Sequence, residues 1–199
     1  STDAITGSQL YQVIEKIGGG PDVYMHVNDG TSTQGAGNAT SNLGKANEKG
    51  GATGQYSVAI GYNTNASGTR SLGIGSDNSA VGNYSGVVGV SNYVSNTAND
   101  TYILGNYNGN SSTPIVSNNS YIVGRSNVAD KAGSQSIYVL GVSNNIKSSN
   151  VYLVGKSNTV FDSDYTYVNG ANNRVTNAVR SVVIGNDIQL NDAQNSIFI

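Results

Sequence analysis

Ser57-Val58-Ala59-Ile60-Gly61 is the stretch that decides the fold, because it recurs with small changes along the rest of the chain. Each later copy ends in a glycine, and a large aliphatic residue precedes that glycine in nearly every copy. The closing glycines are Gly61, Gly75, Gly89, Gly105, Gly124, Gly141, Gly155, Gly170 and Gly185, which lie 14 to 19 residues apart. Repetition at a short and nearly constant period is typical of a solenoid, in which each unit is stable only when it stacks on its neighbours.

A unit of this length is too short for a helix pair or a propeller blade, but it accommodates two short strands and two turns. The sequence therefore predicts an all-β fold, a parallel β-roll (β-solenoid), that extends over residues 52–199 and contains about ten coils. Residues 196–199 begin one further copy without its glycine, so we expect the roll to be truncated at its C-terminus.

The composition limits the possible functions. The chain has 199 residues, a formal net charge of −2 and only 11% charged residues, which excludes the basic surface that nucleic-acid-binding proteins need. It has no cysteine, which excludes disulfides and Cys-x-x-Cys metal or redox sites. We find no signal peptide or membrane-spanning segment, and we interpret the chain as a piece of a longer protein.

Two sets of positions keep a nearly fixed distance from the repeated glycine. Three residues after it stand Asn78, Asn92, Asn108, Asn127, Asn144, Asn158 and Asn173. Five residues after it stand the apolar residues Ala66, Ala80, Val94, Ile146, Val160, Val175 and Leu190. We interpret the apolar set as the second strand of each coil. The asparagines are predicted to lie at the turn, to adopt the left-handed conformation that Asn tolerates, and to hydrogen-bond to each other along the axis.

The strand pattern predicts which face meets a partner. Side chains alternate along a strand, so Ala59 and its small neighbours suit the inside of a thin roll, while Val58 and Ile60 face outward. About ten stacked exposed aliphatic side chains would be a liability in a monomer. We therefore expect an obligate homo-oligomer of parallel protomers. Its predicted packing residues on the roll are Val58, Ile60, Ile74, Tyr102, Tyr121, Tyr138 and Tyr152.

The N-terminal segment differs from the repeats. In residues 1–17, Leu10, Ile14 and Ile17 are spaced as in a coiled-coil seam, which predicts a helix end that packs in a bundle of protomers. The alternative is a short amphipathic helix on the flank of the roll. Residues 18–51 are rich in Gly, Ser, Asn and Thr and are interpreted as a connector or a degenerate first coil. Within them, residues 22–28 alternate like a strand.

Two motifs resemble a known family. SVAIG followed by Ala-x-Gly-x-x-Ser, as in Ala66 to Ser71, resembles the head repeat of YadA-like trimeric autotransporter adhesins of Gram-negative bacteria. Residues 2–11, TDAITGSQLY, resemble the neck that joins such a head to a coiled-coil stalk. Coils after Gly89 depart from the simple repeat, because most are longer and carry Val, Ile or Leu where it has Ala.

This resemblance implies a left-handed, homotrimeric β-roll head, displayed on the bacterial cell surface and held in the outer membrane by an anchor domain outside this chain. It also implies attachment to host cells through a receptor or an extracellular matrix protein, a role in virulence, and a further head or stalk upstream of the neck. Asn- and Tyr-rich heads of this kind are similar to those of fusobacterial adhesins, some of which bind CEACAM receptors.

No pattern in the chain predicts catalysis. His26 is the only histidine and lies outside the repeats, and the acids Asp77, Asp130 and Asp187 do not fall on adjacent coils. There is no HExxH motif, no P-loop and no calcium-binding repeat. We therefore expect no enzyme activity, no cofactor, no metal and no catalytic residue.

Binding is the favoured function. The longest interruption of the repeat lies between Gly105 and Gly124, where Tyr107, Ile115 and Val116 are predicted receptor contacts. Phe161 is a further candidate. The alternatives are a surface insertion without function, or one that packs on the adjacent protomer. The tyrosine column could likewise be a binding face rather than a packing face. For the whole chain, the alternatives are a non-binding spacer head of the same adhesin or a phage tail-fibre solenoid.

Overall fold

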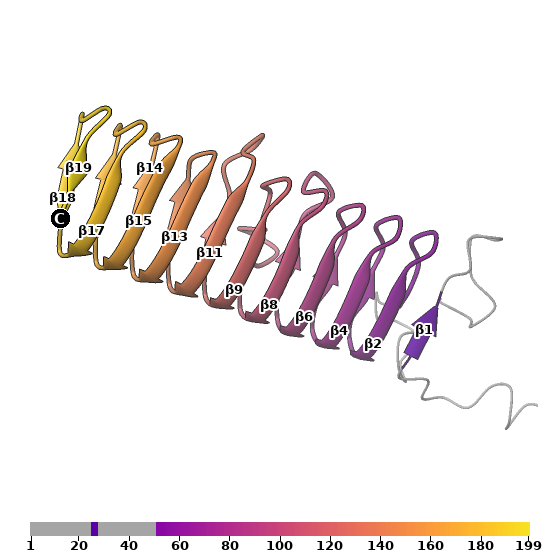
Figure 1. Cartoon of the computed structure of the whole chain (residues 1–199). Helices are drawn as coiled ribbons and strands as arrows, with labels where there is room; N and C mark the ends of the chain where they lie inside the picture. Colours follow the sequence, from indigo (N-terminus) through magenta and orange to yellow (C-terminus); the bar gives the residue numbers. More distant parts are fainter. Residues whose placement is uncertain (1–24, 28–50) are drawn as a thin grey trace, which may run out of the picture.

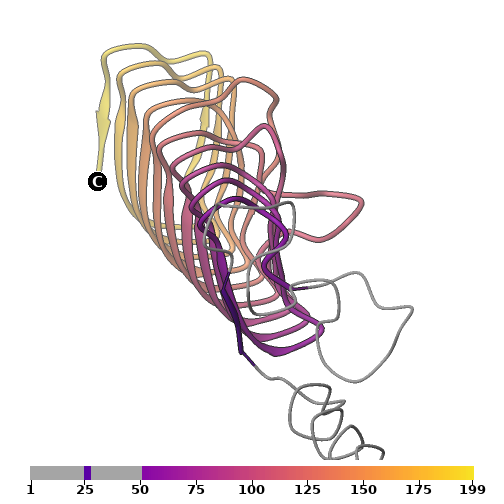
Figure 2. The same ribbon diagram turned by 90° about the vertical axis from the view of Figure 1, so that its right-hand side faces the viewer.

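The computed structural model describes residues 25–27 and 51–199, and residues 51–199 form a regular stack of coils (Figure 1). Each coil contributes one longer strand to a first sheet, and most coils contribute a shorter strand to the opposite side of the roll (Figure 2). Successive coils pair in parallel and in the register of the sequence repeat, glycine beside glycine. The predicted parallel β-roll is therefore confirmed, and the described residues contain no helix.

The first sheet has eleven strands, all parallel except β1. They are β1 (Met25–Val27), β2 (Val58–Tyr62), β4 (Leu72–Ser76), β6 (Gly86–Val90), β8 (Tyr102–Asn106), β9 (Tyr121–Arg125), β11 (Ile137–Val142), β13 (Val151–Lys156), β15 (Thr166–Ala171), β17 (Val182–Asn186) and β19 (Ile197–Phe198). β1 confirms a strand within residues 22–28. It pairs antiparallel with β2, Met25 opposite Ile60, so it covers the edge of the first coil and is not itself a strand of a coil.

The opposite side of the roll is divided into two shorter sheets. One contains β3 (Asn65–Ala66), β5 (Ser79–Ala80) and β7 (Tyr93–Val94). The other contains β10 (Val128–Ala129), β12 (Asn145–Lys147), β14 (Thr159–Phe161), β16 (Arg174–Thr176) and β18 (Gln189–Asn191). A bridge between Val94 and Ile115 and a hydrogen bond from the Val116 N–H to the Ala129 carbonyl, 3.0 Å, continue the stack across the gap.

The core is a narrow file of inward-facing side chains. In the first coils these are Ala52, Ala59 and Ala66, whereas Val58 and Ile60 face outward as the alternation predicts. From the coil of β6 onward the core contains larger residues. These are Val87, Val94, Ile103, Ile115, Ile122, Ile137, Val139, Ile146, Val151, Leu153, Val160, Val168, Val175 and Val183. Each buried aliphatic side chain stabilises the roll by roughly 1.5–3 kcal/mol relative to exposure, so the later coils have the stronger core.

A ladder of buried asparagines closes one corner of the roll. The Asn127 amide donates to Asn108 Oδ1 and to the Gly141 carbonyl, both at 2.9 Å, and Asn144 repeats this pattern one coil further on. The members are Asn78, Asn92, Asn108, Asn127, Asn144, Asn158 and Asn173. The predicted hydrogen bonding along the axis is therefore confirmed.

The predicted left-handed conformation of these asparagines is wrong. The residue with positive φ is the one before, as at Asp77 (φ 55°) and Ser126 (φ 57°), and it follows shortly after a glycine that also has positive φ. The turn is therefore completed before the asparagine. This leaves the asparagine pointing inward, with its amide aligned along the stack.

Candidate functional site

The outward face of the first sheet is an uncharged stripe, two residues wide, that continues from coil to coil. We call it the outer stripe. Its first column is Val58, Leu72, Gly86, Tyr102, Tyr121, Tyr138, Tyr152, Tyr167 and Val182. Its second column is Ile60, Ile74, Val88, Leu104, Val123, Leu140, Val154, Asn169 and Ile184.

Five tyrosines of the first column stack ring on ring. The centroids of successive rings are separated by 5.3, 5.5, 6.2 and 5.5 Å from Tyr102 to Tyr167. Tyr102, Tyr121, Tyr138 and Tyr152 are each about half exposed. Tyr167 was missing from the predicted set, although it stands three residues before its glycine like the others. The asparagine in Tyr167-Val168-Asn169-Gly170 obscured that copy of the repeat.

An apolar hollow of about 280 Å³ lies where the stripe changes from aliphatic to tyrosine residues. Gly86 forms it, because the neighbouring positions carry Leu72 and Tyr102 and Gly86 has no side chain between them. A Cβ atom on Gly86 would lie 2.8 Å from Cδ1 of Tyr102, so the glycine also leaves room for the first ring of the stack.

The structure places seven of the predicted packing residues on this one stripe. Val58, Ile60 and Ile74 are half-buried, and the four predicted tyrosines are exposed. Because these side chains share one continuous face, a single partner surface could cover all of them. The remaining three, Leu10, Ile14 and Ile17, lie outside the described residues.

The predicted receptor contacts between Gly105 and Gly124 divide into an exposed and a buried set. Tyr107 is 55% exposed at the corner after β8, and the guanidinium of Arg125 lies 5.9 Å from its ring centroid. Val116 is half-buried. Ile115 is fully buried, so its prediction as a surface contact is corrected. The insertion leaves the stack after Gly109, whose N–H still donates to the Asn127 carbonyl of the next coil at 3.0 Å. Ile115 then resumes the core position that Val94 and Ala129 occupy in the adjacent coils.

Within this insertion, Asn110 organises the exposed turn. Its Oδ1 accepts hydrogen bonds of 2.8 Å from the N–H groups of Ser112 and Thr113, and its own N–H donates to the Thr113 carbonyl at 3.0 Å. The loop is therefore an ordered projection beside the stack (Figure 2).

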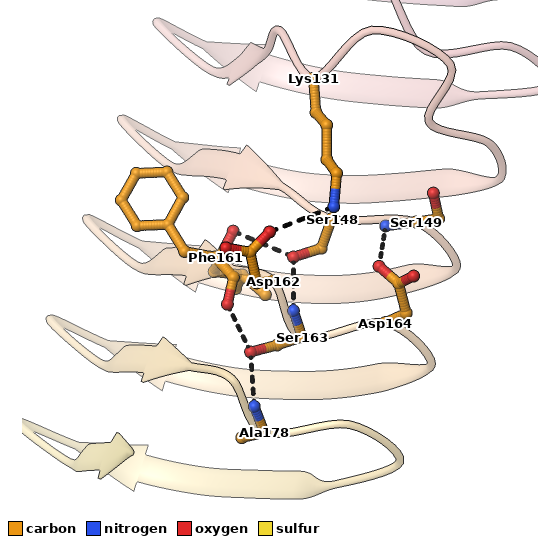
Figure 3. A network of polar contacts seen from close by, with 9 residues as sticks. Lys131, Ser148, Ser149, Phe161, Asp162, Ser163, Asp164 and Ala178 are labelled. Atoms are coloured by element: carbon orange, nitrogen blue, oxygen red, sulfur yellow. Dashed lines mark hydrogen bonds and ion pairs between the residues drawn. The ribbon is translucent and has the colours of Figure 1, made fainter. Parts of the chain in front are cut away.

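Phe161 belongs to a polar network on the later coils through its backbone, and its ring points away to one side of that network (Figure 3). The ammonium of Lys147 is 5.6 Å from its ring centroid, and the ring is half-buried. The backbone carbonyl of Phe161 accepts a hydrogen bond of 2.7 Å from Ser163 Oγ. The nearby ion pair of Lys131 and Asp162, 3.2 Å long, is largely exposed and contributes little to stability.

Removing the Ser163 hydroxyl tests this network. Ser163 Oγ also accepts the Ala178 N–H at 3.0 Å, so Ser163→Ala leaves this buried donor without its partner and removes one of the two hydrogen bonds to the part-buried Phe161 carbonyl. We expect a loss of about 1–3 kcal/mol in the free energy of unfolding, seen as a lower Tm in circular dichroism. Ser112→Ala, in the exposed turn, is the control and should leave the Tm unchanged.

A second group of exposed aromatic residues was not predicted. Arg70 lies between Tyr56 and Tyr84 of the adjacent coils, with its guanidinium 5.5 and 5.6 Å from their ring centroids. All three residues have positive φ and occupy the same corner position of the repeat, where later coils carry Asp, Asn, Ser, Tyr or Arg. The three residues are spaced 14 apart and stand directly before Ser57, Ser71 and Ser85, so the repeat spacing already places them in one column.

Two further features, a metal-ion site and a membrane-spanning helix, can be assessed in the described residues. No three His, Cys, Asp or Glu side chains among them gather closely enough to hold a metal ion. The same residues include no helix long and apolar enough to cross a membrane.

One comparison with known proteins gives a match. Residues 52–78 and 66–85 match two copies of the YadA head domain repeat. Neither the comparison with curated proteins nor the comparison with solved structures gave a match. The matched coils are continuous with the rest of the stack, so the described roll is consistent with a YadA-like head domain. Such a head is a surface-exposed passenger domain of a trimeric autotransporter adhesin.

Proposed function

Because residues 52–85 are YadA head repeats, we propose that this chain is the head of a trimeric bacterial surface adhesin that attaches the cell to a host receptor or to an extracellular matrix protein. The remainder of the protein would anchor it in the outer membrane. The head itself would act by binding and not by catalysis. Residues 1–17 would form the neck, and residues 18–51 would connect the neck to the roll.

The outer stripe supports the homotrimer. Its two columns are uncharged over nine consecutive coils, and parallel copies of the chain would present coils with the same spacing to each other. Exposed side chains such as Leu104 and Leu140, each more than half exposed, would be buried in such an assembly. This burial is a large stabilising term for association.

The observation that carries the binding proposal is the exposed aromatic residue Tyr107 beside an ordered loop on a rigid stack. Tyrosine is favoured at interaction hot spots, and it costs little conformational entropy to fix when the scaffold is already ordered. Tyr107 directly follows the C-terminal end of β8 and is not a member of the outer stripe. It would therefore stay accessible in a trimer that packs through the stripe. Val116 and Phe161 are secondary candidates. The receptor class is a CEACAM-type ectodomain or a matrix protein, and three copies would add avidity.

Tyr107→Ala tests the binding site. The purified chain is screened by biolayer interferometry against CEACAM-type ectodomains, fibronectin, laminin and collagen. For the receptor that binds, Tyr107→Ala should weaken the affinity by a factor of about 10 or more, as loss of a hot-spot aromatic does. Tyr165→Ala is the matched control, because Tyr165 is also an exposed tyrosine with positive φ, at a different corner.

Two outcomes would contradict the proposal in different ways. Unchanged binding of a folded Tyr107→Ala variant would remove the assigned contact but leave the adhesin intact. Absence of binding to every probe by an intact trimer would favour the alternative, a spacer head that carries another binding domain away from the cell.

A further inference from the structure

Asn169 is the one residue of the second column of the outer stripe that is not aliphatic. In the pairing of β13, β15 and β17 it lies between Val154 and Ile184. It is exposed, and its Nδ2 approaches Tyr167 Oη at 3.4 Å, which is long for a hydrogen bond. The amide therefore has most of its hydrogen-bonding capacity available to a partner, in contrast to the buried ladder asparagines, whose amides are fully used within the roll.

We propose that Asn169 fixes the register in which copies of this chain pack along the outer stripe, by pairing with Asn169 of the neighbouring copies. The inference rests on the homotrimer of the proposed function. It adds a specific contact that the repeat itself does not supply. The partner is a second copy of this chain, because only another copy presents an amide at the same coil of an otherwise aliphatic column.

A repetitive apolar face needs such a residue. Coils repeat every ~4.8 Å along the stack, so a copy shifted by one coil would again place an aliphatic side chain against an aliphatic side chain. The tyrosine column has the same weakness, since four of its five rings would meet a tyrosine after a shift of one coil. Hydrophobic contact alone therefore discriminates poorly between correct and shifted assemblies.

Asn169 removes this ambiguity through the cost of an unpaired amide. In register, the Asn169 amides of the protomers lie at one level and can hydrogen-bond to each other. Shifted by one coil, each amide would instead meet Val154 or Ile184, and its polar atoms would be buried without partners. A single polar residue in an apolar seam sets register in coiled coils by the same physics, at some cost in stability.

The decisive experiment moves the asparagine by one coil. A transposed variant, Val154→Asn with Asn169→Val, keeps the composition and the size of the stripe. Wild-type and transposed chains with tags of different mass are unfolded, mixed in equal amounts, refolded and analysed by native mass spectrometry. We expect oligomers of a single chain type to exceed the statistical expectation severalfold. Two differently tagged wild-type chains, treated in the same way, should mix statistically.

A second measurement keeps the inference testable if the transposed variant does not fold. Asn169→Val should raise the Tm of the oligomer at fixed protein concentration by a few degrees, because an aliphatic side chain packs better in this column. Gln189→Val is the matched control, since Gln189 is an exposed polar residue on the opposite side of the roll. The Tm of Gln189→Val should depend on protein concentration no more steeply than the Tm of the wild type does.

The outcomes separate this inference from the proposed function. Statistical mixing of wild-type and transposed chains, or a lower Tm for Asn169→Val, would overturn the role of Asn169 and leave the oligomer standing. A chain that is monomeric at all concentrations would overturn both.

Discussion

Replacing Asn127 with leucine is expected to destabilise the roll by about 3–6 kcal/mol, which is comparable to the whole stability of many small domains. Leucine has the branched shape of asparagine and is larger, so the loss would come from the hydrogen bonds and from overpacking, and not from a cavity. Thermal unfolding followed by circular dichroism at fixed protein concentration measures the effect.

The size of this effect follows from the number of groups that depend on one amide. Asn127 Oδ1 accepts the backbone N–H of Asn144 at 3.1 Å and its side-chain Nδ2 at 2.9 Å. Asn127 Nδ2 supplies the Gly141 carbonyl and Asn108 Oδ1. Leucine removes all four hydrogen bonds and leaves buried polar groups on two adjacent coils without these partners. Each group left unsatisfied costs about 1–3 kcal/mol.

The control is Asn191→Leu, the same exchange at an exposed position of β18. It should change the free energy of unfolding by less than about 0.5 kcal/mol, as surface substitutions usually do. If the Tm of Asn127→Leu stayed within two or three degrees of that of the wild type, the prediction would be contradicted. Such a result would mean that water or a rearranged turn satisfies the polar groups that hydrogen-bond to the Asn127 side chain.

The asparagine ladder also shows why the sequence predicts this fold well. A solenoid places residues separated by one period directly on top of each other, so a column in the aligned repeats becomes a column in space. The inward alanine and valine positions, the outward tyrosines and the asparagine ladder all follow from that rule. The parallel register could therefore be predicted from the spacing of the glycines alone.

The same reasoning fails where a coil breaks the period. Ile115 lies ten residues after Gly105 instead of five, so the insertion hid its equivalence to Val94 and made a core residue look like part of a surface loop. Burial follows the path of the backbone, and the end of an insertion is not marked in the sequence. The Tyr56, Arg70 and Tyr84 group was missed for a different reason. Its members stand one period apart, but the corner position that they occupy is not constrained by the core and carries no fixed residue type in the later coils.

The conformation of the turn is a further detail that the spacing does not determine. Asparagine tolerates the left-handed region, so the local preference predicts a positive φ at the ladder asparagines and not at the residues before them. In the structure, Ser, Asp, Asn and even Tyr107 occupy the left-handed position, because the buried hydrogen bonds of the ladder decide which residue must point inward. Tertiary contacts override the local preference of the residue.

Gly155→Ala is expected to have an effect as large as that of Asn127→Leu, for a reason that is steric and not polar. Gly155 has φ +147°, in a region that residues with a Cβ rarely adopt. A Cβ atom there would overlap the carbonyl oxygen of Gly170 in the next coil and would lie 2.9 Å from Asn158 Nδ2. Backbone strain and overpacking of about 1–3 kcal/mol each would add together. We therefore expect a loss of about 3–6 kcal/mol, or failure to fold, measured by the same thermal unfolding.

Gly133→Ala separates the two parts of this cost. Gly133 also has positive φ, 75°, but an added Cβ would have no neighbouring atom within 4 Å. It should therefore carry only the conformational cost of about 1 kcal/mol for alanine in the left-handed region. If both variants lost the same stability, the close approach of stacked coils would not be the reason for the repeated glycine, and its φ alone would be.

Gly141→Ala isolates the contact, because Gly141 is not among the positive-φ glycines but its added Cβ would also overlap a carbonyl oxygen, that of Gly155. If Gly141→Ala lost clearly more stability than Gly133→Ala, the repeat is fixed by contact between coils. A solenoid is stable only as a stack, and that contact would then explain why the glycine recurs in every coil from Gly61 to Gly185.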